Sequence, residues 1–388
     1  MLVILVTVVL IVYGSVSERI IHVTKDVQSQ SNYEQLKSLR YENFRCPCSN
    51  TRISLKMFVV EMNATFHPVC SSVFVSLNFI EDFRARTGFS SYTTVARDFR
   101  RWGTLLFRFL QSMCLATEST VKDSIDQFLS DTLISTTIIP QIQFESQIKQ
   151  FIDIFKKSIE TQLSRILLVF RATAQGNGLI SVLGTNLQLR YDNNQIDGIL
   201  SYLPQSYEDG SCSCATSSAC FEPASFRERN NTIRYVLQNI YLGCFTLESI
   251  LHSSLSCFYS NSCLTTFKQE FAATPLAIDE PDWAFGSSAP VLPILPPPEN
   301  SRFTTNDSIE TMTESFFIDL WSTQISFEHY FNACTPKHCT YSYTRRADLL
   351  YTLTVFLSVF QGISGVLHFL IPIVVSFILR TFRRLSND

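Results

Sequence analysis

The sequence has no excess of basic charge and no long run rich in lysine and arginine. Its 31 Lys and Arg residues stand against 34 Asp and Glu residues, which gives a formal net charge of −3 and a pI of about 6.1. Proteins that bind nucleic acid through its phosphates need a clustered basic surface. We therefore expect no nucleic acid among the partners.

The sequence also lacks the short motifs on which common enzyme chemistries depend. It contains no H-E-x-x-H, no G-x-S-x-G and no G-x-x-x-x-G-K. Gly176-Asn-Gly178 lacks the third glycine of a dinucleotide turn, and the segment from Asn193 has Pro204 where an EF-hand loop requires glutamate. We expect a non-enzymatic protein with no catalytic, metal-binding or cofactor-binding residue; a site assembled only in three dimensions stays open.

Tryptophan is scarce, with three residues, whereas phenylalanine is abundant, with 32. Apolar residues make up 46% of the chain and the mean hydropathy is +0.12, so the composition excludes overall disorder. The 388 residues suffice for one large domain or two to three ordinary ones. We interpret the phenylalanines as core residues of a mainly α protein with minor β structure.

The sequence has no odd, unpaired cysteine. Its twelve cysteines form groups of four, six and two along the chain, and each group is even. Even groups are typical of disulfides made in an oxidising compartment, and the C-x-C pairs lack the repeated spacing of zinc knuckles. We expect disulfides within each group, with Cys334–Cys339 the best single pairing and Cys257–Cys263 the second. The remaining cysteines are Cys46, Cys48, Cys70, Cys114, Cys212, Cys214, Cys220 and Cys244.

An apolar run, Leu2–Tyr13, opens the sequence. A helix of that length would cover about 18 Å, against a hydrocarbon core of about 30 Å. The run suits the apolar region of a signal peptide with cleavage after Ser17, although the basic residues that usually precede such a region are missing. We expect residues 1–17 to be removed; the alternative is a retained first membrane segment.

A second apolar segment, Leu349–Leu379, carries no charged residue and exceeds the ~20 residues that span a bilayer. Arg380, Arg383 and Arg384 follow at once, which predicts a cytosolic tail over residues 380–388. We therefore expect a single-pass protein of the plasma membrane or another secretory-pathway membrane, with its N-terminal side outside.

The same segment contains small and polar residues that indicate contact with another helix. Gly362 and Gly365 would let a neighbouring backbone approach, and His368 is costly in lipid without a partner. We expect the membrane, and self-association or a protein partner met through this helix, as the partners of the chain.

The residues between the apolar segments divide by composition. Apolar residues recur at alternating intervals of four and three positions from Ile148 to Val169, which predicts a helix packed in a globular core. Pro140 is expected to end the preceding helix, and Gly176 is expected to end this one. Residues 233–272 look helical again, and residues 306–332 resume an amphipathic pattern. The expected regions are a helical region 18–184, a cysteine-rich region 185–274, a proline-rich surface linker 275–305 and a membrane-proximal region 306–348.

Three sequons lie in this part of the chain. Asn63, Asn230 and Asn306 each begin an N-x-[ST] triplet, and about three such triplets would arise by chance. They are compatible with a glycoprotein of the secretory pathway.

Four short motifs carry a resemblance. They are Arg45-Cys-Pro-Cys-Ser, His67-Pro-Val-Cys-Ser-Ser, Ser211-Cys-Ser-Cys-Ala and Ala333-Cys-Thr-Pro-Lys-His-Cys-Thr-Tyr. With the apolar segment that follows, the chain resembles a group of uncharacterised cysteine-rich ectodomain proteins with a C-terminal membrane anchor. The resemblance implies the same layout over most of the chain, and it implies no activity and no functional residue.

The sequence thus predicts a disulfide-linked helical ectodomain followed by one transmembrane helix. The leading expectation is a single-pass type I cell-surface glycoprotein that binds a partner as a receptor, adhesion or recognition module. One alternative is a channel or channel subunit in which Leu2–Tyr13 is a first membrane segment. Another is a membrane fusion glycoprotein, whose long helices, bridges and C-terminal anchor share this general layout.

Overall fold

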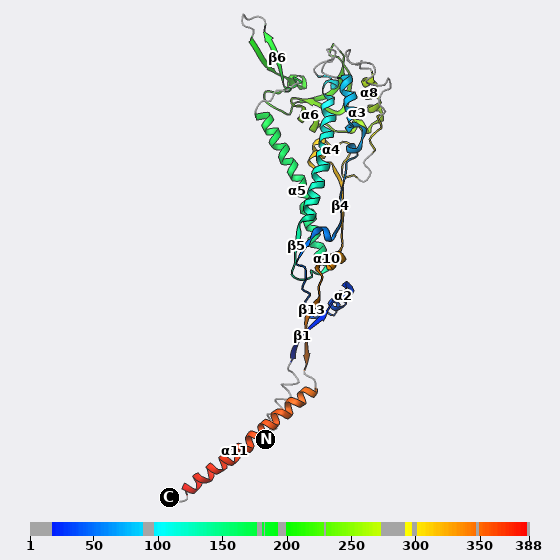
Figure 1. Cartoon of the computed structure of the whole chain (residues 1–388). Helices are drawn as coiled ribbons and strands as arrows, with labels where there is room; N and C mark the ends of the chain where they lie inside the picture. Colours follow the sequence, from blue (N-terminus) through cyan, green and yellow to red (C-terminus); the bar gives the residue numbers. More distant parts are fainter. Residues whose placement is uncertain are drawn as a thin grey trace. The chain divides into compact units, whose positions relative to one another are not determined.

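The computed structural model describes residues 18–87, 97–176, 181, 183–192, 199–228, 230–272, 292–296, 301–346 and 349–385 (Figure 1). These residues are mostly helical with a smaller share of strand, as the sequence predicts. They belong to two compact units. Unit 1 draws on residues 1–53, 133–140 and 328–388, and unit 2 on residues 54–132 and 141–327. The proposed signal peptide, residues 1–17, lies outside the described residues.

Unit 1 is organised around a long pair of antiparallel strands. Its three-stranded sheet has the order β1-β13-β2, and β1 and β13 pair without interruption from Glu18 opposite Arg346 to Asp26 opposite His338. The elements are β1 (Glu18–Asp26), α2 (Gln30–Ser38), β2 (Glu42–Arg45), β3 (Arg52–Ser54, whose last residue belongs to unit 2), α10 (Phe327–Cys334, whose first residue belongs to unit 2), β13 (His338–Arg346) and α11 (Leu349–Leu385).

Two disulfides join the beginning of unit 1 to its end. Cys46 pairs with Cys339 and Cys48 with Cys334, across sequence separations of 293 and 286 residues. The expected Cys334–Cys339 bridge is therefore wrong, and pairing within a group fails for these four cysteines. It holds for the other four bridges, which are Cys70–Cys114, Cys212–Cys220, Cys214–Cys244 and Cys257–Cys263. Strand β2 pairs with β13 and brings Cys46 to Cys339, while the N–H groups of Ser49 and Asn50 donate to the carbonyl of Cys334.

Unit 2 contains two long helices and several short pairs of strands. The principal elements are β4 (Val59–Phe66), α3 (Leu77–Thr87), α4 (Phe99–Ser130), β5 (Thr132–Ile134, shared with unit 1), α5 (Gln141–Gly176), β6 (Leu187–Asp192), β7 (Ile199–Pro204), β10 (Phe221–Arg227), β11 (Ile233–Gly243), α6 (Thr246–His252), α7 (Ser256–Tyr259), α8 (Asn261–Ala272), α9 (Ile309–Glu314) and β12 (Ile318–Ile325). Short 3-10 turns and the strands β8 (Ser206–Tyr207) and β9 (Cys212–Ser213) complete it.

Several predicted helix boundaries are wrong. Residues 233–243 form β11, which pairs with β10, because Leu237, Ile240 and Leu242 bury one side of an extended segment. In 306–332, β12 pairs with β4 and interrupts the expected helical pattern. Helix α4 ends at Ser130, so that Pro140 stands just before α5, whereas α5 does end at Gly176.

The proline-rich segment is not simply a surface linker where the structure describes it. Leu292 and Leu295 are buried in the core of unit 2, and the Leu295 N–H donates to the carbonyl of Phe258 at 3.0 Å. The proline residues around them keep the segment extended, and its two leucines contribute apolar surface to the core.

Phenylalanine rings form the centre of unit 2. Phe83, Phe99, Phe107 and Phe267 are fully buried. Phe83 meets Phe107 edge to face with centroids 5.3 Å apart, as Phe267 meets Phe99 and Phe107, while Phe83 and Phe267 are stacked. Edge-to-face contact suits the ring quadrupoles. Gly103 lies between the rings, because a Cβ there would come within 2.7 Å of Phe99 and 2.9 Å of Phe83. Ten of the 32 phenylalanines are buried in this one core.

His67 is a buried, neutral residue of the same unit. Its Nδ1 accepts the Val69 N–H at 3.2 Å, so the neutral ring carries its proton on Nε2, 2.9 Å from the Tyr259 hydroxyl. Burial lowers the pKa of His67 from 6.5 to about 4, although Asp319 and Asp307 oppose the shift. The side chain is therefore a structural connection between the turn after β4 and α7.

We expect acid to destabilise unit 2 through His67. The unfolded chain takes up this proton near pH 6.5 and the folded protein only near pH 4, so the stabilisation is complete above pH 6.5 and is lost as the pH falls toward 4. The loss is on the order of 3 kcal/mol. Thermal unfolding of wild type and His67→Gln between pH 7 and 4 measures it; equal pH slopes for the two proteins would contradict the assignment.

The two bridges of unit 1 should be mutually redundant. With one bridge intact, the other closes a loop of only about ten residues, whereas loss of both releases a loop of about three quarters of the chain. Removing Cys48 and Cys334 together should cost about 2–3 kcal/mol, and removing all four cysteines should cost roughly twice as much or more. Denaturant unfolding of the serine variants, followed by circular dichroism, tests this, and Cys257→Ser/Cys263→Ser is the control for loss of a local bridge. Equal losses of unfolding free energy in the two-cysteine and four-cysteine variants would refute the redundancy.

Candidate binding groove

The candidate site is a groove on unit 2 with a volume of about 720 Å³. One wall is the C-terminal half of α5, from Ser164 to Ala174, and the other is the start of α6, from Phe245 to Glu248. Leu105 of α4, Leu183 and Glu314 close the remaining sides. The lining combines nine aliphatic or aromatic residues with seven polar ones, three of which are charged, and pockets that bind ligands likewise combine apolar walls with placed polar groups.

The α5 wall exists because this helix leaves the core along its length. Its N-terminal half is packed, with Ile148, Ile152 and Ile159 buried, and Figure 1 shows α5 diverging from α4 toward its C-terminal end. Ile166 and Val169, expected from the sequence to pack in the core, are each 63% exposed. The regular four-and-three spacing holds, but neighbouring elements cover only its first part.

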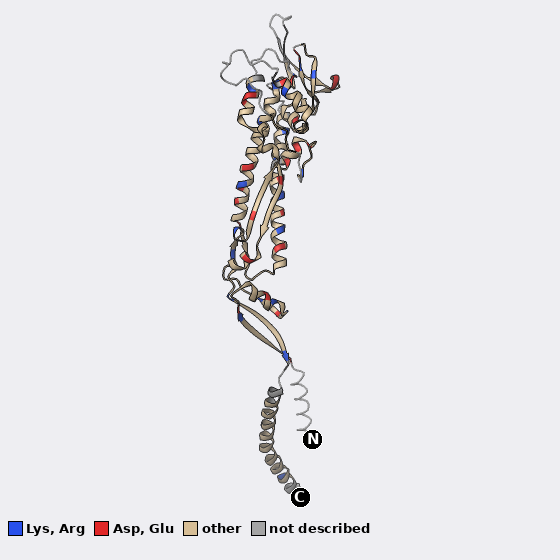
Figure 2. Cartoon of the chain, turned by 90° about the vertical axis from the view of Figure 1, so that its right-hand side faces the viewer, with Lys and Arg blue, Asp and Glu red and all other residues tan. Residues whose placement is uncertain are grey.

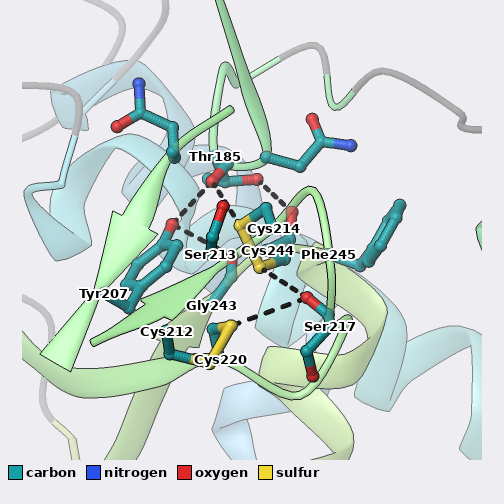
Figure 3. The surroundings of a disulfide bond; sticks show 12 residues. Thr185, Tyr207, Cys212, Ser213, Cys214, Ser217, Cys220, Gly243, Cys244 and Phe245 are labelled. Atoms are coloured by element: carbon teal, nitrogen blue, oxygen red, sulfur yellow. Dashed lines mark hydrogen bonds between the residues drawn. A yellow bond between two sulfur atoms is a disulfide. The ribbon is translucent and has the colours of Figure 1, made fainter. Parts of the chain in front are cut away.

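The α6 wall is fixed by a disulfide cluster. Cys214–Cys244 and Cys212–Cys220 bracket the chain just before Phe245, and Gly243 is required there because a Cβ would lie 2.3 Å from the Cys220 carbonyl oxygen (Figure 3). This part of the groove is therefore rigid, since two covalent bridges and a tight backbone contact position it.

Tyr207 adds a buried hydrogen-bond chain behind the cluster. Its hydroxyl donates to the Thr185 carbonyl at 2.7 Å, and the Thr185 hydroxyl donates to the Cys244 carbonyl at 2.9 Å (Figure 3). Burial raises the pKa of Tyr207, so the phenol stays protonated and remains a donor. The chain connects the strand pairs of unit 2 to the start of α6.

One charged cluster joins the walls of the groove. The Arg171 guanidinium forms a bidentate contact with Glu248, at 2.8 and 2.9 Å, and a further hydrogen bond with Glu310 of α9. Burial disfavours the cation, but the hydrogen bonds that Arg171 donates to Glu310 and Glu248 outweigh it and raise the pKa of Arg171. Arg171 therefore ties α5 to both α6 and α9 at the centre of the groove.

The predicted sites are distributed over the structure rather than gathered at the groove. All twelve cysteines form disulfides, so that none remains as a thiolate ligand for a metal; Cys257 pairs with Cys263, as the sequence predicts, and Cys70 with Cys114. The sequon residues Asn63, Asn230 and Asn306 are exposed, as attachment of a glycan requires. Gly362, Gly365 and His368 are exposed on α11.

Sequence reasoning missed the groove. The signal was available in Ile166–Phe170, a run of five consecutive apolar residues in a helix. Five consecutive positions turn through more than one full revolution, so one packed face cannot bury them all. Leu168 and Phe170 are accordingly 68% and 56% exposed.

Comparison with known proteins gives no relative. No family model matches the chain, and neither the curated proteins nor the solved structures contain a match. The features that bear on function are therefore the groove, the sheet of unit 1 and α11.

Replacing Arg171 should destabilise unit 2. Arg171→Met leaves two carboxylates facing each other in a partly buried site, and we expect a loss of about 2 kcal/mol in the free energy of unfolding. Arg302→Met is the matched control. Within the described residues Arg302 makes a single ion pair, with Glu160, which is more exposed, so this substitution should cost less than about 1 kcal/mol. Urea unfolding at pH 7 compares them; a larger cost for Arg302 would disprove the role of the cluster.

Proposed function

We propose that the protein is a subunit of a membrane channel with two membrane segments and a disulfide-linked ectodomain between them. The observation that carries this proposal is the register of β1 and β13 in unit 1. Glu18, the first residue of β1, is opposite Arg346, the last residue of β13. Paired Cα atoms in antiparallel strands are about 5 Å apart.

This register brings both apolar segments of the sequence to one end of one pair of strands. Residues 1–17 contain no charged side chain and lead directly into β1, while α11 begins at Leu349, three positions after Arg346. As a helix, 17 residues would measure about 26 Å, close to the hydrocarbon thickness of about 30 Å. Retention of both segments in one bilayer fits the pairing without any change in unit 1.

The second support is the distribution of polar residues on α11. Its segment Phe356–Thr381 is long and apolar enough to cross a membrane, and Figure 2 shows charged residues along the long helices of unit 2 but few on α11. Six of its polar and small residues lie within one sector of about 80°. They are Thr354, Ser358, Gln361, Gly365, His368 and Ser376. Gly362 and Ser364 lie about 80° to either side of the centre of that sector, and Thr381 lies on the opposite side.

Such a polar face is characteristic of helices around water. Polar side chains within membrane segments face a bundle interior or an aqueous cavity, because exposure to lipid is costly. A channel subunit that places Ser358, Gln361 and His368 along its pore satisfies this condition.

A second candidate is the single-pass type I glycoprotein that binds a partner. Ser17 is small and β1 starts at the next residue, so cleavage there would leave the strand complete. In that form the groove of unit 2 would be the recognition site, and the basic tail would hold α11 in its orientation.

One set of measurements separates the two candidates. Mass analysis of the N-terminal peptide of the mature protein should find Met1 retained, and a mature start at Glu18 would replace the channel by the single-pass glycoprotein. The purified chain in planar bilayers should conduct ions. Gln361→Leu should lower the unitary conductance several-fold, because it removes a polar group from the pore wall. Val359→Leu, on the opposite side of α11, is the control and should conduct as wild type does; equal loss in both would contradict the polar face.

A further inference from the structure

Helix α5 has two opposite apolar faces in its C-terminal half. At 100° per residue, Leu167, Arg171 and Ala174 share the face that lines the groove. Ile166 and Val169 share the other face, roughly 140° away, and both are largely exposed. We call these two residues the α5 ridge. A helix that is apolar on opposite sides is normally buried on both.

We propose that the α5 ridge of one copy packs into the groove of the next copy, so that the chains assemble into a closed ring. The chain carries both halves of such a contact, a pair of protruding apolar side chains and an apolar groove of about 720 Å³. Exposed patches of this kind mark protein interfaces in soluble protein regions. Because the two surfaces lie on opposite sides of one helix, a single copy cannot bring them together.

Charge supports the same partner. Arg165 is exposed beside the α5 ridge, and Glu314 is exposed where α9 closes the groove. Neither side chain makes an ion pair within the part of the chain that the structure describes. In the proposed contact the arginine of one copy approaches the acidic rim of the next, which gives the interface a fixed direction.

The symmetry follows from the anchor. A contact between different surfaces of identical chains is heterologous, and it produces either rings or open filaments. Here the inference rests on the proposed function, because anchoring of every copy through α11 confines the contacts to one membrane. A closed ring is the heterologous assembly of limited size.

Paired cysteines test the contact directly. In the full chain in membranes, Val169→Cys/Leu247→Cys should form intermolecular disulfides under mild oxidation and give a ladder that ends at one closed oligomer. Val169→Cys alone and Leu247→Cys alone should stay monomeric on non-reducing gels, because neither surface meets itself. Cross-linking by Val169→Cys alone would replace the heterologous contact by a two-fold one. Absence of cross-links in the double variant, together with a monomeric wild type under a lysine-reactive cross-linker, would overturn the proposal.

A charge exchange tests the partner without new thiols. Arg165→Glu should lower the fraction of oligomer about tenfold, because it places like charges across the interface. Arg165→Glu/Glu314→Arg should restore it, and Lys157→Glu, an exposed change elsewhere on α5, should leave it unchanged. A double variant no better than the single one would exclude the pairing and leave another protein, or another segment of this chain, as occupant of the groove.

The result is separable from the channel proposal. Conductance with no cross-links would keep the channel and remove the α5 contact. Cross-links to a closed ring with no conductance and a mature start at Glu18 would keep the ring and remove the channel.

Discussion

The covalent connection of residues 46 and 48 to residues 339 and 334 is the constraint on which unit 1 depends. It closes loops of 293 and 286 residues, about three quarters of the chain, and in the unfolded chain such long loops cost more entropy to close than local ones. Beside these bridges, β1 and β13 are paired over nine residue pairs. The strand pair in turn places Glu18 opposite Arg346, the two described residues that stand nearest in sequence to the apolar segments.

Unit 2 is held in a different way. Its centre is a set of phenylalanine rings around Gly103, and four further disulfides contribute buried cysteines to the same core. The first half of α5 packs against other side chains, with Ile159 against Val121, Phe316 and Ile318, whereas Ile166 and Val169 in its second half are largely exposed. The exposed half is where the groove lies. The packed part of α5 and the part that lines the groove are therefore separate.

The sequence was a better guide to the presence of disulfides than to which cysteines pair. The even cysteine count and the lack of zinc spacing were enough for disulfides, and a six-residue separation was enough for Cys257–Cys263. The pairing of Cys46 and Cys48 depends on β2 lying next to β13, a long-range contact that spacing along the chain does not contain. For the same reason the linear division into regions could not anticipate units made of separate segments.

Local pattern also failed where tertiary contacts decide the outcome. Residues 233–243 have apolar spacing compatible with helix, yet the partner strand β10 makes them extended. Ile152 and Ile166 occupy equivalent positions of one seven-residue repeat, but only Ile152 has neighbours to pack against. The groove is a consequence of that missing cover, so only the arrangement of α4, α5 and α6 could reveal it. The polar face of α11, by contrast, is readable from the sequence alone.

The long reach of the unit 1 bridges has a consequence for biosynthesis. Cys46 and Cys48 emerge early, but their partners are about 290 residues further on, which at 5–20 residues per second is roughly 15 to 60 s of translation. In an oxidising compartment the two thiols stand one residue apart for that whole interval, close to each other and to Cys70. Correct pairing then requires that early, non-native bridges be reversible, so the yield of native chain depends on thiol–disulfide exchange catalysed during and after synthesis.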